Sequence, residues 1–155
     1  MKVHIRSSLK EDINGLKAVV DSSELFPSEY LDEMMFDYFN NQDSEDIWFT
    51  CLNADKIIGL GYCVPEKLTD RTYNLLAIGV SKDLQGKGVG RMMMVYIEQV
   101  LKEKSKRLLI VETSSDNQYK LTREFYEKLD YRHEATIRDF WREGEDKIIY
   151  WKILN

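Results

Sequence analysis

The chain has 155 residues, of which 43% are hydrophobic and 32% are charged, and its formal net charge is −5. This length suits a single domain over residues 1–155 with a sizeable core. The counts of 8 Gly, 2 Pro and 2 Cys exclude collagen-like, disordered and disulfide-stabilised classes. The acidic balance argues against a nucleic-acid binder, which usually carries an excess of Lys and Arg.

No apolar run approaches the roughly 20 residues that a membrane-spanning helix needs, and the first six residues alternate like a strand rather than a secretory signal. We therefore expect a cytoplasmic protein without a membrane partner. A hairpin turn at Asn53–Lys56 would place Cys51 opposite Ile58 and leave Cys63 out of register with Cys51, which predicts two buried free thiols. Neither cysteine has a metal-binding motif around it, so no metal is expected.

The first half of the chain predicts one strand, two helices and a three-stranded meander. Val3–Arg6 reads as a strand, and Ser8 with Glu11 has the spacing of a capping box before a helix ending near residues 21–23. Pro27 and Ser28 open a second helix. The apolar runs 47–52, 57–64 and 73–80, separated by turn-forming stretches, predict the three antiparallel strands.

The second half alternates helices and strands. A helix rich in methionine follows residues 81–90, and Leu108–Val111 is a continuous apolar run that suits a buried strand paired in parallel. A last helix over 122–129 precedes two strand-like runs at 133–137 and 147–154. The predicted fold is α/β (α+β), a mixed, mostly antiparallel sheet flanked by helices in the order β-α-α-β-β-β-α-β-α-β-β.

The most informative segment is the glycine loop, which we define as residues 85–91, between a predicted strand and a predicted helix. Its three glycines allow close approach of a ligand and positive φ angles. Backbone N–H groups and the positive end of the next helix would bind a phosphate there, with Lys87 and Arg91 adding charge. The loop lacks the Gly-Lys-Ser/Thr ending of a Walker A motif, and Arg91 stands where the dinucleotide fingerprint needs its last glycine.

Two segments together resemble the GNAT (Gcn5-related) N-acetyltransferase family. The segment Gln85-Gly86-Lys87-Gly88-Val89-Gly90 is similar to the family's Q/R-x-x-G-x-G/A pyrophosphate loop. The segment from Phe125 to Tyr131 resembles the family's F-Y-E-K-L-G-F sequence. The predicted order of elements agrees with the family's fold over essentially the whole chain.

The resemblance implies acetyl-CoA as the acetyl donor and assigns residues to it. The backbone of the fourth strand would bind the pantetheine arm, and the loop amides would bind the pyrophosphate. The family's usual Asn contact corresponds to Tyr119, while Asn117 lies two residues earlier, so both stay open. The implied cofactor-binding residues are Ile78, Gly79, Val80, Gln85, Gly86, Lys87, Gly88, Val89, Gly90, Arg91, Asn117, Tyr119 and Tyr126.

The resemblance also suggests catalytic residues. Tyr126 would be the general acid for the leaving thiolate, since phenol and thiol have comparable pKa values of roughly 10 and 8.5; its alternative is an ordinary core aromatic. The fourth strand carries no carboxylate, so Glu112 is the candidate general base or, alternatively, a structural glutamate.

The acceptor would be a primary amine of a small molecule, amino acid or peptide, and Phe26, Tyr30 and Trp141 are the candidate wall of its site. The leading hypothesis is an N-acetyltransferase using direct transfer in a ternary complex. Alternatives are a non-catalytic acyl-CoA-binding regulatory module on the same fold and an unrelated nucleotide-binding domain. An apolar edge near the last strands would support a homodimer, and the sequence leaves the oligomeric state open.

Overall fold

The computed structural model describes residues 1–155 and contains seven strands and four α-helices. They follow one another in the order that the sequence predicts. The strands are β1 (Val3–Ser7), β2 (Ile47–Asn53), β3 (Lys56–Pro65), β4 (Thr72–Val80), β5 (Leu108–Ser114), β6 (Arg132–Arg142) and β7 (Glu145–Ile153). The helices are α1 (Ile13–Ser23), α2 (Leu31–Asn40), α3 (Val89–Glu103) and α4 (Lys120–Lys128). None of them combines the length and apolar character that crossing a bilayer requires.

The strands form one mixed, mostly antiparallel sheet in the order β1-β2-β3-β4-β5-β7-β6. The parallel pair is β4 with β5, whose register runs from Thr72 opposite Leu108 to Leu75 opposite Val111. The continuous apolar run at the start of β5 therefore predicted its parallel pairing correctly.

Residue contacts divide the chain into two compact units. Unit 1 comprises Met1–Pro65 and Leu76–Gln99, and unit 2 comprises Glu66–Leu75 and Val100–Asn155. Strand β4 and helix α3 each contribute residues to both units. The prediction of one domain over residues 1–155 remains a prediction.

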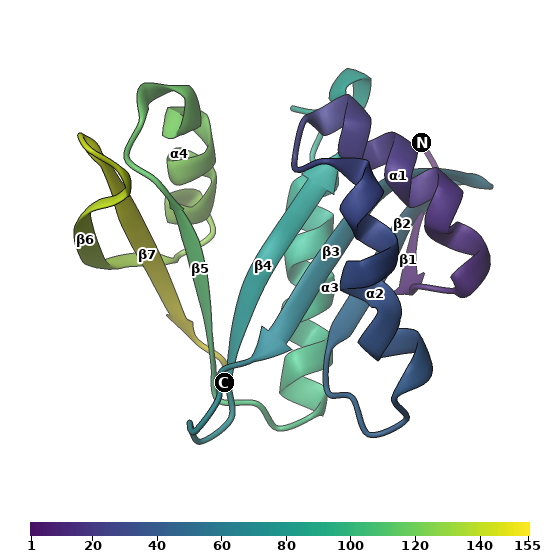
Figure 1. Ribbon diagram of the computed structural model, residues 1–155, viewed down its shortest axis with the longest axis horizontal. Helices are drawn as coiled ribbons and strands as arrows, with labels where there is room; N and C mark the ends of the chain where they lie inside the picture. The colour runs from purple at the N-terminus through teal and green to yellow at the C-terminus, as the bar shows by residue number, and fades with distance from the viewer. The chain divides into compact units, whose positions relative to one another are not determined.

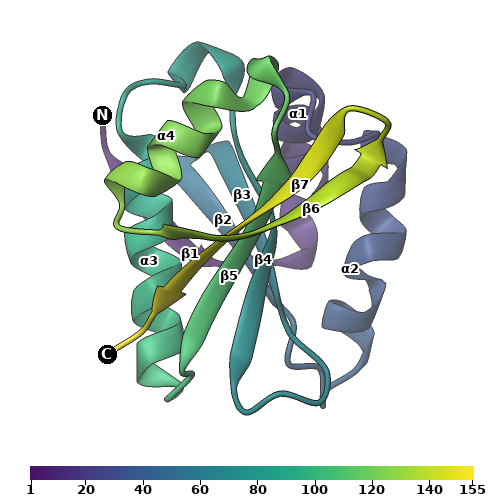
Figure 2. The same cartoon turned by 90° about the vertical axis from the view of Figure 1, so that its left-hand side faces the viewer.

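Unit 1 is layered, with α1 and α2 on one side of strands β1 to β3 and α3 on the other (Figures 1 and 2). On the first side, Leu16, Val19 and Val20 of α1 are buried in a cluster that includes Trp48 of β2. On the other side, the ring of Phe49 contacts that of Tyr96 from α3. The side chains of Trp48 and Phe49, adjacent residues of β2, therefore pack on opposite faces of the sheet, as the alternation of side chains along a strand requires.

The start of α1 differs from the predicted capping box. The carboxylate of Asp12 accepts a hydrogen bond from the Leu9 amide at 2.8 Å, ion-pairs with Arg6 at 2.7 Å and accepts from the Thr50 hydroxyl at 3.0 Å. The Ser8 hydroxyl lies 2.8 Å from that of Thr50 instead of capping the helix. The prediction of Ser8 as the N-cap is wrong because a buried strand residue offers it a partner across the sheet.

Both cysteines are buried and free, as predicted. Their register differs from the prediction, because an irregularity between Cys51 and Leu52 pairs Cys51 with Gly59 rather than with Ile58. Cys63 pairs with Ile47 at the other end of the same ladder. The two thiols therefore occupy different rungs of the β2–β3 ladder.

In unit 2, β7 lies between β5 and β6, and α4 lies beside these strands (Figure 2). The ring of Tyr126 from α4 contacts the rings of Tyr131 and Tyr150. Strand β6 is exposed along its whole length and extends to Arg142, well past the predicted end at Ile137. Its pairing with β7 is irregular between Ile137 and Arg142, so the tip of this hairpin departs from a regular ladder.

Candidate functional site

The glycine loop in unit 1 is held where it follows β4. The Ser81 amide donates to the Ile58 carbonyl at 2.8 Å, and the Lys82 amide donates to the Ser22 hydroxyl at 2.8 Å. The Gln85 side-chain amide reaches back to the Val80 carbonyl at 3.0 Å. These bonds fix the point at which the chain leaves β4.

The middle of the loop is open and has positive φ angles, a backbone conformation that favours glycine. Gly86 and Gly88 have φ angles of 75° and 86°, and a Cβ atom built on either would meet nothing within 4 Å. The space around both backbones is therefore free for a ligand, while the positive φ angles orient the peptide groups.

Helix α3 begins directly after this turn. The Met92 amide makes a helical hydrogen bond to the Gly88 carbonyl, so the amides of Val89, Gly90 and Arg91 precede the first such bond. The side chains of Lys87 and Arg91 are exposed and make no ion pair. Unpaired N–H groups, the helix dipole and two free cations together form an environment that suits a phosphate.

The backbone assigned to the pantetheine arm immediately precedes the loop. Gly79 and Val80 are buried and Ile78 is partly buried. A Cβ atom on Gly79 would lie 3.1 Å from Leu25 and 3.2 Å from the Ser23 hydroxyl, which are close approaches to the end of α1. The glycine therefore also allows tight packing within unit 1.

Tyr126 is buried in unit 2, with only 3% of its surface exposed. Its ring packs against Phe125, Tyr131 and Tyr150, and burial raises the pKa of its hydroxyl above the ordinary value of 10. No other group of the protein hydrogen-bonds to this hydroxyl. The phenol is therefore protonated at neutral pH and has its hydrogen-bonding capacity free.

Glu112 of β5 lies in a polar cluster of unit 2. Its Oε2 is 2.6 Å from the Lys147 ammonium, and its Oε1 accepts from Asn74 Nδ2 at 3.1 Å. The same Asn74 nitrogen donates to Glu66 Oε1 at 2.8 Å. Lys147 also lies over the ring of Phe140, 4.1 Å from its centroid. Both carboxylate oxygens of Glu112 therefore have partners within unit 2.

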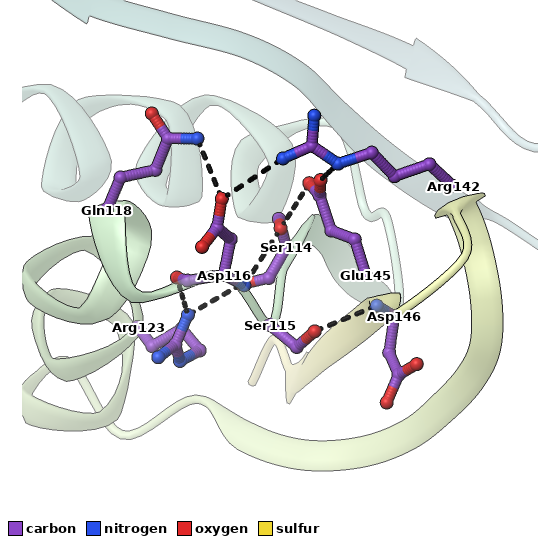
Figure 3. A network of polar contacts seen from close by, with 8 residues as sticks. All are labelled: Ser114, Ser115, Asp116, Gln118, Arg123, Arg142, Glu145 and Asp146. Atoms are coloured by element: carbon purple, nitrogen blue, oxygen red, sulfur yellow. Dashed lines mark hydrogen bonds and ion pairs between the residues drawn. The ribbon is translucent and has the colours of Figure 1, made fainter.

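The turn between β5 and α4 is organised by a polar network (Figure 3). Arg123 donates to the carbonyls of Ser114 and Asp116 at 2.7 and 2.8 Å. The Ser114 hydroxyl donates to Glu145 at 2.6 Å, and Arg142 bridges Glu145 and Asp116. These contacts connect the turn to the tip of the β6–β7 hairpin.

The two candidates for the family's Asn contact lie in a short 3₁₀ turn, Asn117–Tyr119, next to this network. The Tyr119 side chain is 39% exposed. The Tyr119 amide donates to the Asp116 carbonyl at 3.0 Å, which closes the turn. Assignment of either residue to the cofactor stays a prediction.

The chain resembles known proteins in sequence and in fold. Residues 16–131 match the acetyltransferase (GNAT) family. The chain belongs to the GNAT acetyltransferase family. No curated protein matches its sequence.

Among solved GNAT-like structures, a candidate GNAT-family acetyltransferase from Desulfovibrio desulfuricans is 29% identical, with a TM-score of 0.90 over 99% of both chains. The ribosomal-protein-S18-alanine N-acetyltransferase from Escherichia coli is 18% identical, with a TM-score of 0.79 over 99% of this chain and 94% of its own. An aminoglycoside 6′-N-acetyltransferase complexed with coenzyme A is 16% identical, with a TM-score of 0.79 over 98% and 97%. The last two show the fold alone.

The residues proposed for the acceptor of this GNAT protein are divided between the units. Phe26 and Tyr30 belong to unit 1, and Tyr30 is 53% exposed. Trp141 belongs to unit 2, is 49% exposed, and donates from its indole nitrogen to the Thr113 carbonyl at 3.3 Å. Each is accessible within its own unit, and their joint role remains a prediction.

Three polar residues around Glu112 were not predicted from the sequence. Glu66 and Asn74 adjoin Glu112, and Lys147 neutralises it, although these residues lie in three different parts of the sequence. A signal was present at Asn74, since a lone amide in an otherwise apolar strand needs a partner when buried. No group of three or more His, Cys, Asp or Glu side chains is arranged to hold a metal ion.

Proposed function

We propose that the chain is an acetyl-CoA-dependent N-acetyltransferase that acetylates a primary amine of a small molecule, an amino acid or a peptide. The observation that carries this proposal is the glycine loop, where open space at Gly86 and Gly88 adjoins unpaired helix amides and the free cations Lys87 and Arg91. The cofactor's phosphates are the chemistry that such a loop binds. The backbone of Ile78 to Val80 would receive the pantetheine arm.

Tyr126 is proposed to protonate the leaving sulfur. In the transfer, a bond forms between the acceptor nitrogen and the acetyl carbon as the bond from that carbon to sulfur breaks. The Tyr126 hydroxyl gives its proton to the sulfur, and burial raises its pKa so that it carries this proton before the reaction.

Glu112 is proposed to accept the proton that the acceptor nitrogen loses, directly or through a water molecule. Its Oε2 lies 2.6 Å from the Lys147 ammonium.

Direct transfer in a ternary complex is favoured over an acetylated cysteine. Both thiols are buried, and burial raises the pKa of Cys51 to about 11 and raises that of Cys63 further. Neither thiol is therefore a thiolate at neutral pH, which is the form that would act as a nucleophile.

A thiol-release assay tests the proposal. The protein is incubated with acetyl-CoA and a panel of primary amines, amino acids and peptides, and free coenzyme A is measured. We expect saturable release with at least one acceptor class and a fall of about a hundredfold in kcat for Tyr126→Phe. Saturable binding of acetyl-CoA without turnover across the panel would reject the enzyme.

One observation favours a second candidate, a non-catalytic acyl-CoA-binding regulatory module. Both oxygens of Glu112 already have protein partners, which is what a purely structural glutamate would show. The same assay distinguishes the two, since the regulatory module predicts binding of acetyl-CoA without release of its thiol.

A further inference from the structure

Two connections of unit 2 lie side by side at the end of the sheet where β4 and β5 begin (Figure 1). They are residues 66–71, between β3 and β4, and residues 104–107, between α3 and β5. The Arg107 amide donates to the Arg71 carbonyl at 2.9 Å, and the Arg71 guanidinium donates to the Ser105 carbonyl at 3.2 Å. These hydrogen bonds join the two connections into one surface.

This surface is basic although the protein as a whole is acidic. We define the basic patch as residues 66–71 and 102–107, which adds the last two residues of α3 to the two connections. The basic patch has six Lys or Arg and three Asp or Glu, so its formal charge is +3 and that of the remaining chain is −8. Its six cationic residues are Lys67, Arg71, Lys102, Lys104, Lys106 and Arg107.

A basic helix end does not by itself account for the basic patch. Lys102 lies in the last turn of α3, where a cation interacts favourably with the helix dipole. Lys104 follows the end of α3, and Lys67 lies on the other connection. All three lysines are exposed, and none of them forms an ion pair with a carboxylate. Their charges are therefore available to a partner.

Leu68 adds a fully exposed apolar side chain to these charges, with a relative exposure of 107%. Its connection is closed by its own hydrogen bonds, since the Glu66 amide donates to the Thr72 carbonyl at 2.8 Å and the Thr69 hydroxyl donates to the Glu66 carbonyl at 2.8 Å. The loop therefore presents Leu68 in a defined position. An apolar anchor with charged residues around it is the usual arrangement of a protein–protein interface.

We propose that the basic patch, together with Leu68, is a docking surface for an acidic protein partner that offers apolar side chains to Leu68. The charge complementarity would speed association and set the orientation of the partner. Contact with Leu68 would add apolar burial that charge pairs alone do not provide.

A compact acidic protein fits this surface better than an extended polyanion does. A nucleic acid or an anionic membrane would reach beyond the basic patch and meet the remaining chain, whose charge is −8. The basic patch also lacks an aromatic ring for stacking with bases, and the adjoining Tyr73 is only 2% exposed. One leucine supplies too little apolar surface for stable insertion into a membrane.

This docking surface is independent of the proposed acetyl transfer. The basic patch adjoins the first residue of β5, Leu108, whereas the polar network of Figure 3 begins at its last residue, Ser114. The proposed transfer uses no residue of the basic patch. Failure of either proposal therefore leaves the other standing.

The test is fluorescence anisotropy of labelled peptides titrated with the full chain. A peptide of the repeat Glu-Glu-Leu is the probe, a Gln-Gln-Leu peptide removes its charge, and a Glu-Glu-Ser peptide removes its apolar side chains. We expect saturable binding of the Glu-Glu-Leu peptide, weakened by added salt. Each control peptide should bind at least about tenfold more weakly.

Two sets of variants locate the binding on the protein. Lys67→Gln combined with Lys104→Gln should weaken binding about fivefold, the effect of two exposed charge pairs. The matched control is Lys10→Gln combined with Lys56→Gln, which makes the same change of charge at two exposed lysines of unit 1. Its affinity should stay within about twofold of wild type, since no lysine of the basic patch is lost.

Leu68→Ala should weaken binding about tenfold, and Leu121→Ala, a change at another exposed leucine, should leave it unchanged. Both side chains are exposed, so neither variant disturbs the core. The absence of saturable binding to the Glu-Glu-Leu peptide, or equal affinities in the patch variants and their controls, would overturn the docking surface. Tighter binding of a single-stranded oligonucleotide or of phosphatidylglycerol vesicles than of the peptide would overturn its assignment to a protein partner.

Discussion

At the scale of single residues, Tyr126 and Tyr150 are neighbouring aromatics with different tasks. Their ring centroids are 5.8 Å apart, but only the Tyr150 hydroxyl has a protein partner, Glu127 at 2.7 Å. Under the proposed function, Tyr126→Phe should lower kcat about a hundredfold and leave the free energy of unfolding unchanged, because no hydrogen bond is lost.

Tyr150→Phe is the matched control for this prediction. It should lower the free energy of unfolding by about 1 kcal/mol through loss of the bond to Glu127, and leave kcat unchanged. Steady-state kinetics and urea titrations of both variants provide the comparison. Equal kcat values for Tyr126→Phe and wild type across the pH range would remove Tyr126 as the general acid.

Asp12 provides a stability prediction with a defined pH dependence. Burial tends to raise its pKa, but hydrogen bonds from Arg6, the Leu9 amide and Thr50 outweigh burial and hold the pKa below 3.8. A depressed folded-state pKa stabilises the protein above the unfolded-state pKa, and this contribution is lost as the pH falls through the folded-state value.

Asp12→Asn should therefore lower the free energy of unfolding at pH 7 by about 3 kcal/mol, because it leaves Arg6 without its partly buried partner. The difference from wild type should shrink as the pH falls below 3.8, the ordinary pKa of the carboxyl group, towards the lower folded-state pKa at which Asp12 becomes protonated. Urea unfolding at a series of pH values measures both effects. A difference that stays constant down to the acid transition would contradict the assignment.

Residue identity was easier to predict from the sequence than residue environment. The aromatic segment that contains Tyr126 stands out by its resemblance to a family motif. The ion pair of Glu112 could not be predicted, because Lys147 reaches it only through the pairing of β5 with β7, where Ser114 lies opposite Lys147. A sequence shows which side chains carry charge, whereas cross-strand neighbours depend on register.

At the scale of elements, the glycine loop can be tested against another glycine with the same backbone strain. Gly88 and Gly144 have φ angles of 86° and 83°, and a Cβ atom on either would meet nothing within 4 Å. Alanine at either position should lower the free energy of unfolding by a similar amount, about 1–2 kcal/mol. The loss falls to the lower end of this range if the turn relaxes.

Only Gly88→Ala should also weaken coenzyme A binding, because relief of the strain reorients the amides at the start of α3. The rise in Tm at a fixed coenzyme A concentration measures this effect. We expect the rise to be reduced or lost in Gly88→Ala and retained in Gly144→Ala. Equal rises in the two variants would show that the loop does not bind the cofactor.

The order of the elements was predictable because hydrophobic periodicity and turn residues agree along the chain. The predicted ends of the helices and strands were wrong where those signals are weak. Strand β6 runs to Arg142 although every residue in it is exposed, so no alternation of apolar and polar residues marks its extent. The predicted cap at the start of α1 was wrong for another reason. The Asp12 carboxylate accepts a hydrogen bond from the Leu9 amide, while the Ser8 hydroxyl hydrogen-bonds to Thr50 of β2.

At the scale of the whole molecule, the net charge of −5 affects the donor and the acceptor differently. Under the proposed function, the polyanionic donor acetyl-CoA would depend on local groups, the amides of the glycine loop with Lys87 and Arg91, to overcome this charge. A cationic acceptor would be favoured by the overall charge. The division of the chain into two contact units could not be predicted, because β4 and α3 run through both without a linker.

The reactivity of Cys51 and Cys63 tests whether the protein unfolds cooperatively. Cys51 and Cys63 are fully buried in adjacent core strands, and burial raises the pKa of each, so both should be inert to a thiol reagent in native buffer. We expect both to react together, with a denaturant midpoint equal to that of Trp fluorescence, because exposing either requires separating β2 and β3 from their helices. In a Cys63→Ala variant, the reaction with the thiol reagent comes from Cys51 alone. Fast reaction of one thiol in native buffer would contradict this burial and would reopen the route through an acetylated cysteine.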